Sequence, residues 1–291
     1  MSDHVRVYEV GPRDGLQNEK VFIPTEAKIA LINLLSQAGF EKIEATSFVS
    51  PKWVPQLADA AEVMEGITRQ DGVDYSVLTP NLRGYEAAKD ARADEVSVFA
   101  SASEEFSQKN INCSIEESLQ RFIPVIAAAQ NASIPVRGYV SCVVDCPYSG
   151  TVDPIAVRDV AFAMSEMGCY EISLGDTIGR ATPDAVLRML ETVTDLVAPE
   201  KLAGHFHDTG GMACENVSVG LEMGLRTFDS AVGGLGGCPY APGAKGNLST
   251  TLLVSLLEKR GFHTGIDPYL LAEAEALVAS FATQTTQKTT T

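Results

Sequence analysis

Strand-like and helix-like segments alternate along the whole chain, and this alternation limits the possible folds more than any other feature. The strands are predicted at residues 5–10, 40–45, 74–78, 95–100, 135–142, 169–174, a run from 201 to the histidines near 205, and 227–232. Helices are predicted at 24–38, 56–69, 81–90, 114–131, 153–167, 182–196, 212–223 and 247–260. Such alternation implies a parallel sheet. Eight units in 291 residues favour a closed (β/α)8 TIM barrel, which typically needs about 250 residues, over an open doubly wound sheet.

The predicted barrel forms a single domain. Residues 1–281 hold the barrel and a C-terminal helical cap, and the Thr/Gln-rich tail 282–291 is expected to be disordered. Several helix ends carry local signals: Gly39 as a C-cap, Asn81 as an N-cap, and Ser114 with Glu117 as a capping box. These signals support the predicted helix boundaries independently of hydrophobic periodicity.

Charge and composition exclude some classes of partner. The net charge of −16 argues against nucleic acid, because phosphate contacts require a basic face. The chain has no run of about 18 apolar residues, so no membrane span is expected. Its N-terminal residues lack the apolar core of a signal peptide. Six cysteines in a chain of this length form no dense disulfide framework, which predicts free thiols and a cytoplasmic location.

Two histidines stand two residues apart at the end of the seventh predicted strand. Side chains at i and i+2 of a strand point to the same face, so His205 and His207 converge on one point. The pair, taken alone, is equally compatible with surface histidines and with a metal site, which often begins with two imidazoles. The neighbouring polar residues decide between these alternatives.

Polar residues follow several of the other predicted strands. They are Arg13, Asp14 and Gln17 after the first strand, Glu44 and Ser47 at the second, Asp176 after the sixth, and Cys238 and Asn247 after the eighth. Active sites of this barrel lie at the carboxyl ends of the strands. We therefore expect these side chains to share one rim with the histidines.

The residue types on this rim favour a hard divalent cation. A carboxylate and two imidazoles with open positions suit Mg²⁺ or Mn²⁺ better than a structural zinc, which would require thiolates. The predicted ligands are Asp14, His205 and His207, with Asn247 as a further oxygen donor. Arg13 would stabilise negative charge that develops on an enolate or carboxylate oxygen. Cys238 lies in a glycine-rich loop, where its thiol could reach a bound substrate.

Four motifs resemble the 3-hydroxy-3-methylglutaryl-CoA (HMG-CoA) lyase family of the metallolyase TIM-barrel superfamily. They are Val10–Glu19 (VGPRDGLQNE), Glu44–Gln56, Lys109–Ser118 and Gly236–Tyr240 (GGCPY). The resemblance covers nearly the whole chain. It implies cleavage of HMG-CoA to acetyl-CoA and acetoacetate, a step of leucine degradation, and it suggests a homodimer.

The resemblance also implies residue roles. Asp14, His205, His207 and Asn247 would bind the metal, Arg13 would hold the enolate, and Cys238 would be a catalytic thiol. Gln17, Glu44 and Asp176 would position substrate or water. Lys20, Lys52 and Lys109 are candidates for contacts to the CoA phosphates by their loop positions. The acceptor of the first proton is left open between His205, Asp14 and water, although a carboxylate bound to a dication is a poor base.

The chain departs from the family pattern at three positions. Gly210 replaces a tyrosine, Thr251 replaces a glutamate and Asp145 replaces a glycine. Because the first two lie near the expected site, the same chemistry on a different 3-hydroxy-3-substituted acyl-CoA is an alternative. A condensing synthase and a non-catalytic CoA-metabolite binding protein are further alternatives, against which Cys238 and the complete polar set argue.

Overall fold

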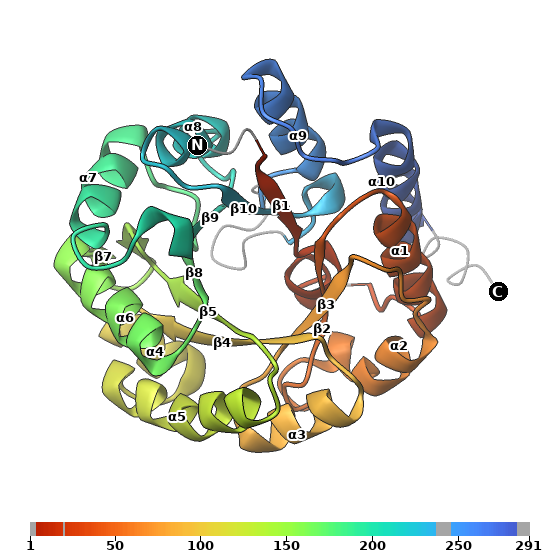
Figure 1. The fold of residues 1–291 in the computed structure, drawn as a ribbon, viewed down its shortest axis with the longest axis horizontal. Helices are drawn as coiled ribbons and strands as arrows, with labels where there is room; N and C mark the ends of the chain where they lie inside the picture. Colours follow the sequence, from red (N-terminus) through yellow and green to blue (C-terminus); the bar gives the residue numbers. More distant parts are fainter. Residues whose placement is uncertain (1–3, 20, 237–245, 284–291) are drawn as a thin grey trace.

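Eight parallel strands close into a barrel that is surrounded by helices (Figure 1). The computed structural model describes residues 4–19, 21–236 and 246–283. The barrel strands are β1 (Arg6–Glu9), β2 (Lys42–Ser47), β3 (Asp74–Leu78), β4 (Glu95–Ser101), β5 (Val136–Ser141), β8 (Glu171–Asp176), β9 (Leu202–Phe206) and β10 (Thr227–Ser230). Their order around the barrel is β1-β10-β9-β8-β5-β4-β3-β2, and β2 pairs with β1 to close it. The predicted (β/α)8 barrel is confirmed.

The helices follow the strands in sequence and pack around the outside of the barrel. They are α1 (Thr25–Gln37), α2 (Ala60–Gly66), α3 (Leu82–Asp90), α4 (Glu104–Ile111), α5 (Ile115–Asn131), α6 (Pro154–Met167), α7 (Pro183–Val193), α8 (Ala213–Glu222), α9 (Thr250–Lys259) and α10 (Pro268–Thr283). Short helical turns occupy η1 (Gly11–Gly15), η2 (Pro55–Leu57), η3 (Pro199–Lys201) and η4 (Val232–Gly234). Among the described residues, no helix combines the length and apolar character that crossing a membrane requires.

The two faces of each strand meet different environments. Outward residues such as Val7 and Ile43 join the apolar layer between sheet and helices. Inward residues are often polar: the buried Tyr8 hydroxyl donates to Glu95 Oε1 at 2.6 Å and lies 2.7 Å from Ser76 Oγ. Buried polar groups are stable only when paired, so the interior is a hydrogen-bonded network. This network continues toward the carboxyl ends of the strands, where the candidate site lies.

The predicted helix-end signals are confirmed by geometry. The side chains of Asn81 and Ser114 accept the backbone N–H groups of Gly84 and Glu117, and Glu117 completes the capping box. Gly39 follows α1 with φ +94°, and a Cβ there would strike the carbonyl oxygen of Gly265. Only glycine adopts that conformation without strain.

Several predicted boundaries were wrong for tertiary reasons. The helix predicted at 56–69 is divided into η2 and α2, and the buried side chain of Gln56 bonds to Val21 O and Ile23 N instead of facing solvent. The helix predicted from Asn247 begins at Thr250, because residue 247 forms a bridge with His207. Helix α4 and the hairpin of β6 (Asp145–Cys146) and β7 (Gly150–Thr151) were not predicted.

The C-terminal helix extends slightly beyond the predicted cap. α10 begins at Pro268 and ends at Thr283, two residues past the boundary that we placed at 281. It packs against α1, α9 and η4. The rest of the predicted tail, residues 284–291, lies outside the described residues.

Candidate active site

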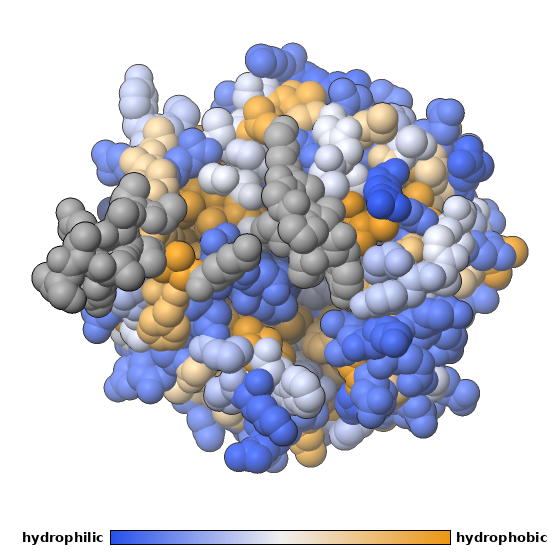
Figure 2. Space-filling view, turned by 180° about the vertical axis from the view of Figure 1, so that it is seen from behind, coloured by the Kyte–Doolittle hydropathy of each residue, from blue (hydrophilic) through white to orange (hydrophobic). Residues whose placement is uncertain are grey.

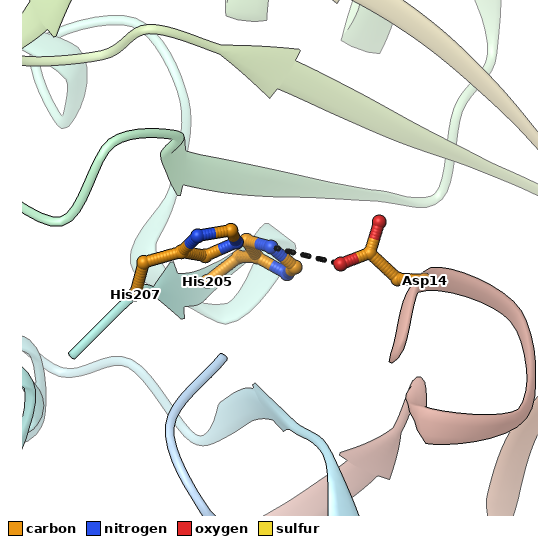
Figure 3. Close-up of side chains that lie close together, drawn as sticks. All are labelled: Asp14, His205 and His207. Carbon is orange, nitrogen blue, oxygen red and sulfur yellow. Dashed lines mark ion pairs between the residues drawn. The ribbon is translucent and has the colours of Figure 1, made fainter. Parts of the chain in front are cut away.

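Three ligand-type side chains converge at the carboxyl end of the barrel. Asp14 comes from η1 after β1, and His205 and His207 come from β9 and the residue after it. One potential ligand atom from each lies within 4.8 Å of the other two. The two imidazole rings lie together and face the carboxylate of Asp14 (Figure 3), with His205 Nε2 4.0 Å from Asp14 Oδ2. The predicted convergence of these residues is therefore present in the fold.

The environment of this triad suits a cation. Nδ1 of His207 is buried and has no hydrogen-bond partner in the part of the chain that the structure describes. A buried polar atom without a partner is costly, and a bound ion would satisfy it. Burial would raise the pKa of Asp14, but the charges of Arg13, His205 and His207 outweigh it and lower the pKa well below its usual range. Burial and the neighbouring His205 lower the pKa of His207 to about 4, which keeps this ring neutral and able to bind metal.

Asn247 adjoins the triad through backbone and side chain. Its backbone bridges to that of His207, and its Nδ2 donates to Asp14 Oδ2 at 2.7 Å. Rotation of the amide by 180° exchanges its nitrogen and oxygen, so the same position can present an oxygen ligand. The predicted fourth ligand is thus in contact with the predicted first.

Arg13 lies between two carboxylates. Its Nη1 donates to Asp14 Oδ1 at 2.7 Å, and its Nε and Nη2 both lie 2.6 Å from Glu44 Oε2. Although burial lowers the pKa of Arg13, the charges of Glu44 and Asp14 raise it, so the guanidinium stays charged. Three of its five N–H groups are used in these contacts, which leaves two for a substrate oxygen.

Glu44 receives a further contact from a residue that the sequence analysis missed. The Tyr139 hydroxyl donates to Glu44 Oε2 at 3.1 Å, and its ring meets the edge of the His205 ring at a centroid distance of 6.1 Å. Oε1 of Glu44 is buried and unpartnered among the described residues. A polar residue at an inward position of a predicted strand was the available signal for Tyr139.

Asp229 and Arg137 were also missed. Asp229 Oδ2 lies 3.1 Å from His205 Nδ1, and Arg137 pairs with the same carboxylate. Both are fully buried charged residues within predicted strands, which is unusual enough to have marked them as candidates.

Two other predicted residues are engaged in local turns. Asp176 ends β8, and its oxygens accept the N–H groups of Arg180 and Ala181; burial raises its pKa to about 6. The Ser47 hydroxyl accepts the N–H of Val49 at 3.2 Å. Neither belongs to the triad of potential metal ligands.

The remaining predicted substrate residues lie farther out. Gln17 lines a surface cleft of about 350 Å³ together with Phe22, Trp53 and Gln56, and Lys52 stacks on the Trp53 ring at 5.6 Å. Lys109 lies in the last turn of α4 and is not among the residues that line this cleft. Cys238 and Lys20 lie outside the described residues.

Figure 2 shows hydrophilic residues at the floor of a hollow near the centre of the face opposite to that of Figure 1.

Two of the three departures from the family pattern occupy exposed positions, and the third, Asp145, is partly buried. Gly210 is exposed, and a Cβ there would meet only the carbonyl oxygen of Gly179, at 2.9 Å. Thr251 is also exposed, and its hydroxyl donates to Glu275 of α10 at 2.6 Å. Asp145 lies 3.8 Å from Arg180 in an ion pair. These neighbours, Gly179, Glu275 and Arg180, do not belong to the triad.

Curated proteins similar to this chain share most of its length. A curated relative, the cytoplasmic 3-hydroxy-3-methylglutaryl-CoA lyase of Mus musculus, is 54% identical over 98% of this chain and 83% of its own length. Both cytoplasmic and mitochondrial enzymes occur among the curated relatives.

Solved structures of HMG-CoA lyases are similar to this chain in both sequence and fold. The HMG-CoA lyase of Brucella melitensis is 60% identical with a TM-score of 0.94, covering 95% of this chain and 98% of that one. The HMG-CoA lyase of Acinetobacter baumannii, in complex with coenzyme A and 3-methylmalate, is 40% identical with a TM-score of 0.91, covering 97% and 92%. The HMGL-like family matches residues 4–278. The chain belongs to the HMGL-like family.

Proposed function

We propose that this chain cleaves HMG-CoA to acetyl-CoA and acetoacetate with the help of a bound Mg²⁺ or Mn²⁺. The observation that carries the proposal is the convergence of Asp14, His205 and His207 within 4.8 Å, with Arg13 bonded to the same aspartate. This arrangement combines a cation site and a fixed positive charge in a chain that belongs to the family of these lyases.

The side chains that would hold the cation are those of Asp14, His205, His207 and Asn247. When bound, such a cation serves as a Lewis acid and as a template for a hydroxyl and a neighbouring carbonyl oxygen. Carboxylate, amide oxygen and imidazole together fit Mg²⁺ or Mn²⁺, and the described part of the site offers no thiolate.

Proton transfer requires a base other than Asp14. Its lowered pKa makes this carboxylate a weak acceptor. His205 has one ring nitrogen available, because Nδ1 is engaged by Asp229 and only Nε2 faces Asp14. That nitrogen cannot bind a cation and accept a proton at the same time. For the state in which His205 holds a cation, we propose a water molecule in the site as the acceptor of the C3 hydroxyl proton.

Bond cleavage then depends on Arg13. Loss of the hydroxyl proton turns C3 into the ketone of acetoacetate, and the C2–C3 bond electrons pass to an enolate on the thioester. The free N–H groups of Arg13 stabilise that oxygen electrostatically. A proton returned to C2 gives acetyl-CoA, and we assign this step to Cys238, which lies outside the described residues.

We assign the substrate to HMG-CoA itself. The coenzyme A complex of the Acinetobacter baumannii relative supports an acyl-CoA. The changes at Gly210 and Thr251 that suggested a different acyl group lie at exposed positions, beside Gly179 and Glu275. For the CoA moiety we propose the cleft lined by Gln17 and Trp53, next to Lys52.

Steady-state kinetics on a panel of 3-hydroxy-3-substituted acyl-CoA thioesters tests this assignment. We expect kcat/KM for HMG-CoA of about 10⁴ M⁻¹s⁻¹ or more, as ordinary enzymes show for their substrates. A value below about 10² M⁻¹s⁻¹ with a larger analogue above about 10⁴ M⁻¹s⁻¹ would establish the alternative substrate instead. Turnover of none of them would favour a binding protein, and net condensation of the products would favour a synthase.

The cellular location and the oligomeric state are separate proposals. We propose a cytoplasmic protein, in line with the cytoplasmic mouse relative, although mitochondrial relatives also exist. We propose a homodimer, which sedimentation equilibrium of the purified chain would measure directly.

A further inference from the structure

The carboxylate of Asp229 lies directly behind His205. The two residues are partners in the register of the neighbouring strands β10 and β9, so both side chains enter the barrel at the same level. Asp229 Oδ2 lies 3.1 Å from His205 Nδ1 and also accepts the Ser173 hydroxyl at 2.7 Å. Its side chain is fully buried. No sequence motif pointed to it.

A buried arginine fixes the orientation of this carboxylate. Arg137 donates through Nη2 to Asp229 Oδ1 at 2.7 Å and through Nη1 to Oδ2 at 3.1 Å. Such a two-point pair prevents the carboxylate from rotating. Arg137 itself is held by Glu171, at 2.8 Å from Nε, and by the Tyr8 ring, whose centroid lies 4.0 Å from its Cζ.

The contacts of Asp229 determine which nitrogen of His205 carries hydrogen. Because its two oxygens accept two N–H groups of the Arg137 guanidinium and Oδ2 also accepts the Ser173 hydroxyl, the carboxylate is paired as an anion. An ionised carboxylate can only accept hydrogen bonds. Nδ1 of His205 must therefore be the N–H nitrogen, and the lone pair of the neutral ring is left on Nε2. That atom faces Asp14.

The second histidine of the pair lacks such support. Nδ1 of His207 has no hydrogen-bond partner within the described ranges. The two imidazoles are therefore not equivalent: one is held by the barrel interior, whereas the other depends on whatever binds in the site.

We propose that Asp229 is a positioning residue that holds His205 with its hydrogen on Nδ1 and directs Nε2 into the divalent-cation site. Arg137 acts through Asp229 and fixes the carboxylate. Partners of this kind behind a metal-binding histidine set its orientation and basicity, and their loss typically weakens metal binding about 10–100-fold. The inference rests on the proposed function, because it assumes that the site binds Mg²⁺ or Mn²⁺.

The test compares two isosteric variants in metal-stripped full-length protein. Asp229→Asn removes the charge behind His205. Glu171→Gln removes a buried carboxylate from the other side of the same guanidinium, and this residue does not contact His205. Titration with Mn²⁺, followed calorimetrically without substrate, should show about 10–100-fold weaker binding for Asp229→Asn and a change of less than about threefold for Glu171→Gln.

Each other result overturns a defined part of the inference. Equal weakening in both variants would mean that the effect arises from the packing of Arg137 and not from the contact to His205. Unchanged affinity in a folded Asp229→Asn protein would remove the positioning role. Failure of the wild-type protein to bind either Mn²⁺ or Mg²⁺ would instead refute the cation site of the proposed function, and this inference with it.

A measurement on the wild-type protein covers the case in which Asp229→Asn does not fold. Histidine labelled with ¹⁵N reports which ring nitrogen carries hydrogen, and His207→Ala helps to assign the His205 signals. In the Mg²⁺-saturated protein we expect the Nδ1–H form of His205. The Nε2–H form would overturn the proposal, because Asp229 would then face an atom without a hydrogen.

Discussion

At the scale of single residues, Arg13 is held on both sides by carboxylates. Its side chain is 7% exposed and lies between Asp14 and Glu44. Two ionised carboxylates around one guanidinium more than offset its charge from a distance, yet the N–H groups left free remain directed and desolvated. Such preorganised donors stabilise charge that develops in a transition state more than charge that is already present.

Arg13→Gln should therefore lower kcat by about 10²–10³-fold or more, since one aimed donor is typically worth that factor. Mn²⁺ binding should persist, because the triad remains. Removal of the guanidinium also leaves the Tyr139 hydroxyl as the one hydrogen-bond donor to Glu44 among the described residues. Breaking a buried ion pair in this way costs about 3–5 kcal/mol of unfolding free energy. Kinetics, metal titration and urea unfolding measure the three effects.

Arg13→Lys is the matched control for this prediction. Lysine retains the charge but not the planar fork, so stability should recover more than activity. Full activity in Arg13→Gln would contradict the proposed role of Arg13 in stabilising the enolate.

At the scale of elements, one buried glutamate joins the segments that carry the site. Glu9 Oε1 accepts the N–H groups of Gly11 in η1 and Val232 in η4, and Oε2 accepts the hydroxyl of Thr250 at the start of α9. These segments lie next to Arg13–Asp14 and Asn247 in the chain. A Cβ at Gly15 would lie 2.7 Å from Leu235 Cβ, so glycine lets η1 approach the loop after β10.

This glutamate makes stability depend on pH. Burial chiefly raises the pKa of Glu9 from 4.5 to about 7, and the negative charge of Glu275 adds to the increase. Because the folded-state pKa is the higher one, its contribution to stability is complete below pH 4.5 and is lost as pH rises to about 7.

Glu9→Gln, which does not titrate, should remove this dependence. The unfolding free energy of the wild type relative to the variant should fall by roughly 3 kcal/mol between pH 4.5 and 8. Urea unfolding of both proteins across this range measures the difference. Contributions from groups that titrate identically in both proteins cancel in the difference between their unfolding free energies. A constant difference would mean that Glu9 is ionised throughout.

At the scale of the whole molecule, closure of the barrel brings the first and last strands together. β1 pairs with both β2 and β10, so Asp14 after the first strand meets histidines that lie nearly 200 residues later in the chain. A ligand that binds this junction stabilises contacts between the two ends of the fold. Binding to the folded state alone raises its stability by mass action.

A divalent cation should therefore raise the thermal midpoint. Mn²⁺ at 100 times its dissociation constant adds about 2.7 kcal/mol, which corresponds to roughly 4–5 °C for a domain of this size. Chelation by EDTA should reverse the shift and abolish activity, and added Mg²⁺ or Mn²⁺ should restore both. Differential scanning calorimetry and activity assays follow the two effects.

Two histidine variants provide the comparison. His207→Ala should abolish the shift, whereas His263→Ala should retain it, because His263 pairs with the segment before β1 at the opposite end of the strand. Activity unchanged in metal-free protein would contradict the proposed chemistry.

The sequence by itself determined the local features of this protein. These features depend on residues a few positions apart. They are the strand and helix periods, the helix caps at Asn81 and Ser114, and the shared strand face of His205 and His207. Since eight such units admit very few topologies, the barrel and the rim that carries Arg13 and Asp14 also followed from local patterns.

Only the tertiary structure decided the contacts between distant strands. Register places Asp229 behind His205, and the bridge to His207 draws Asn247 out of the predicted helix. The tertiary structure also places Gly210 and Thr251 at exposed positions, which no pattern along the chain could show. The reason is physical: side-chain direction repeats over two to four residues and can be read locally, whereas partners and burial depend on how the barrel closes.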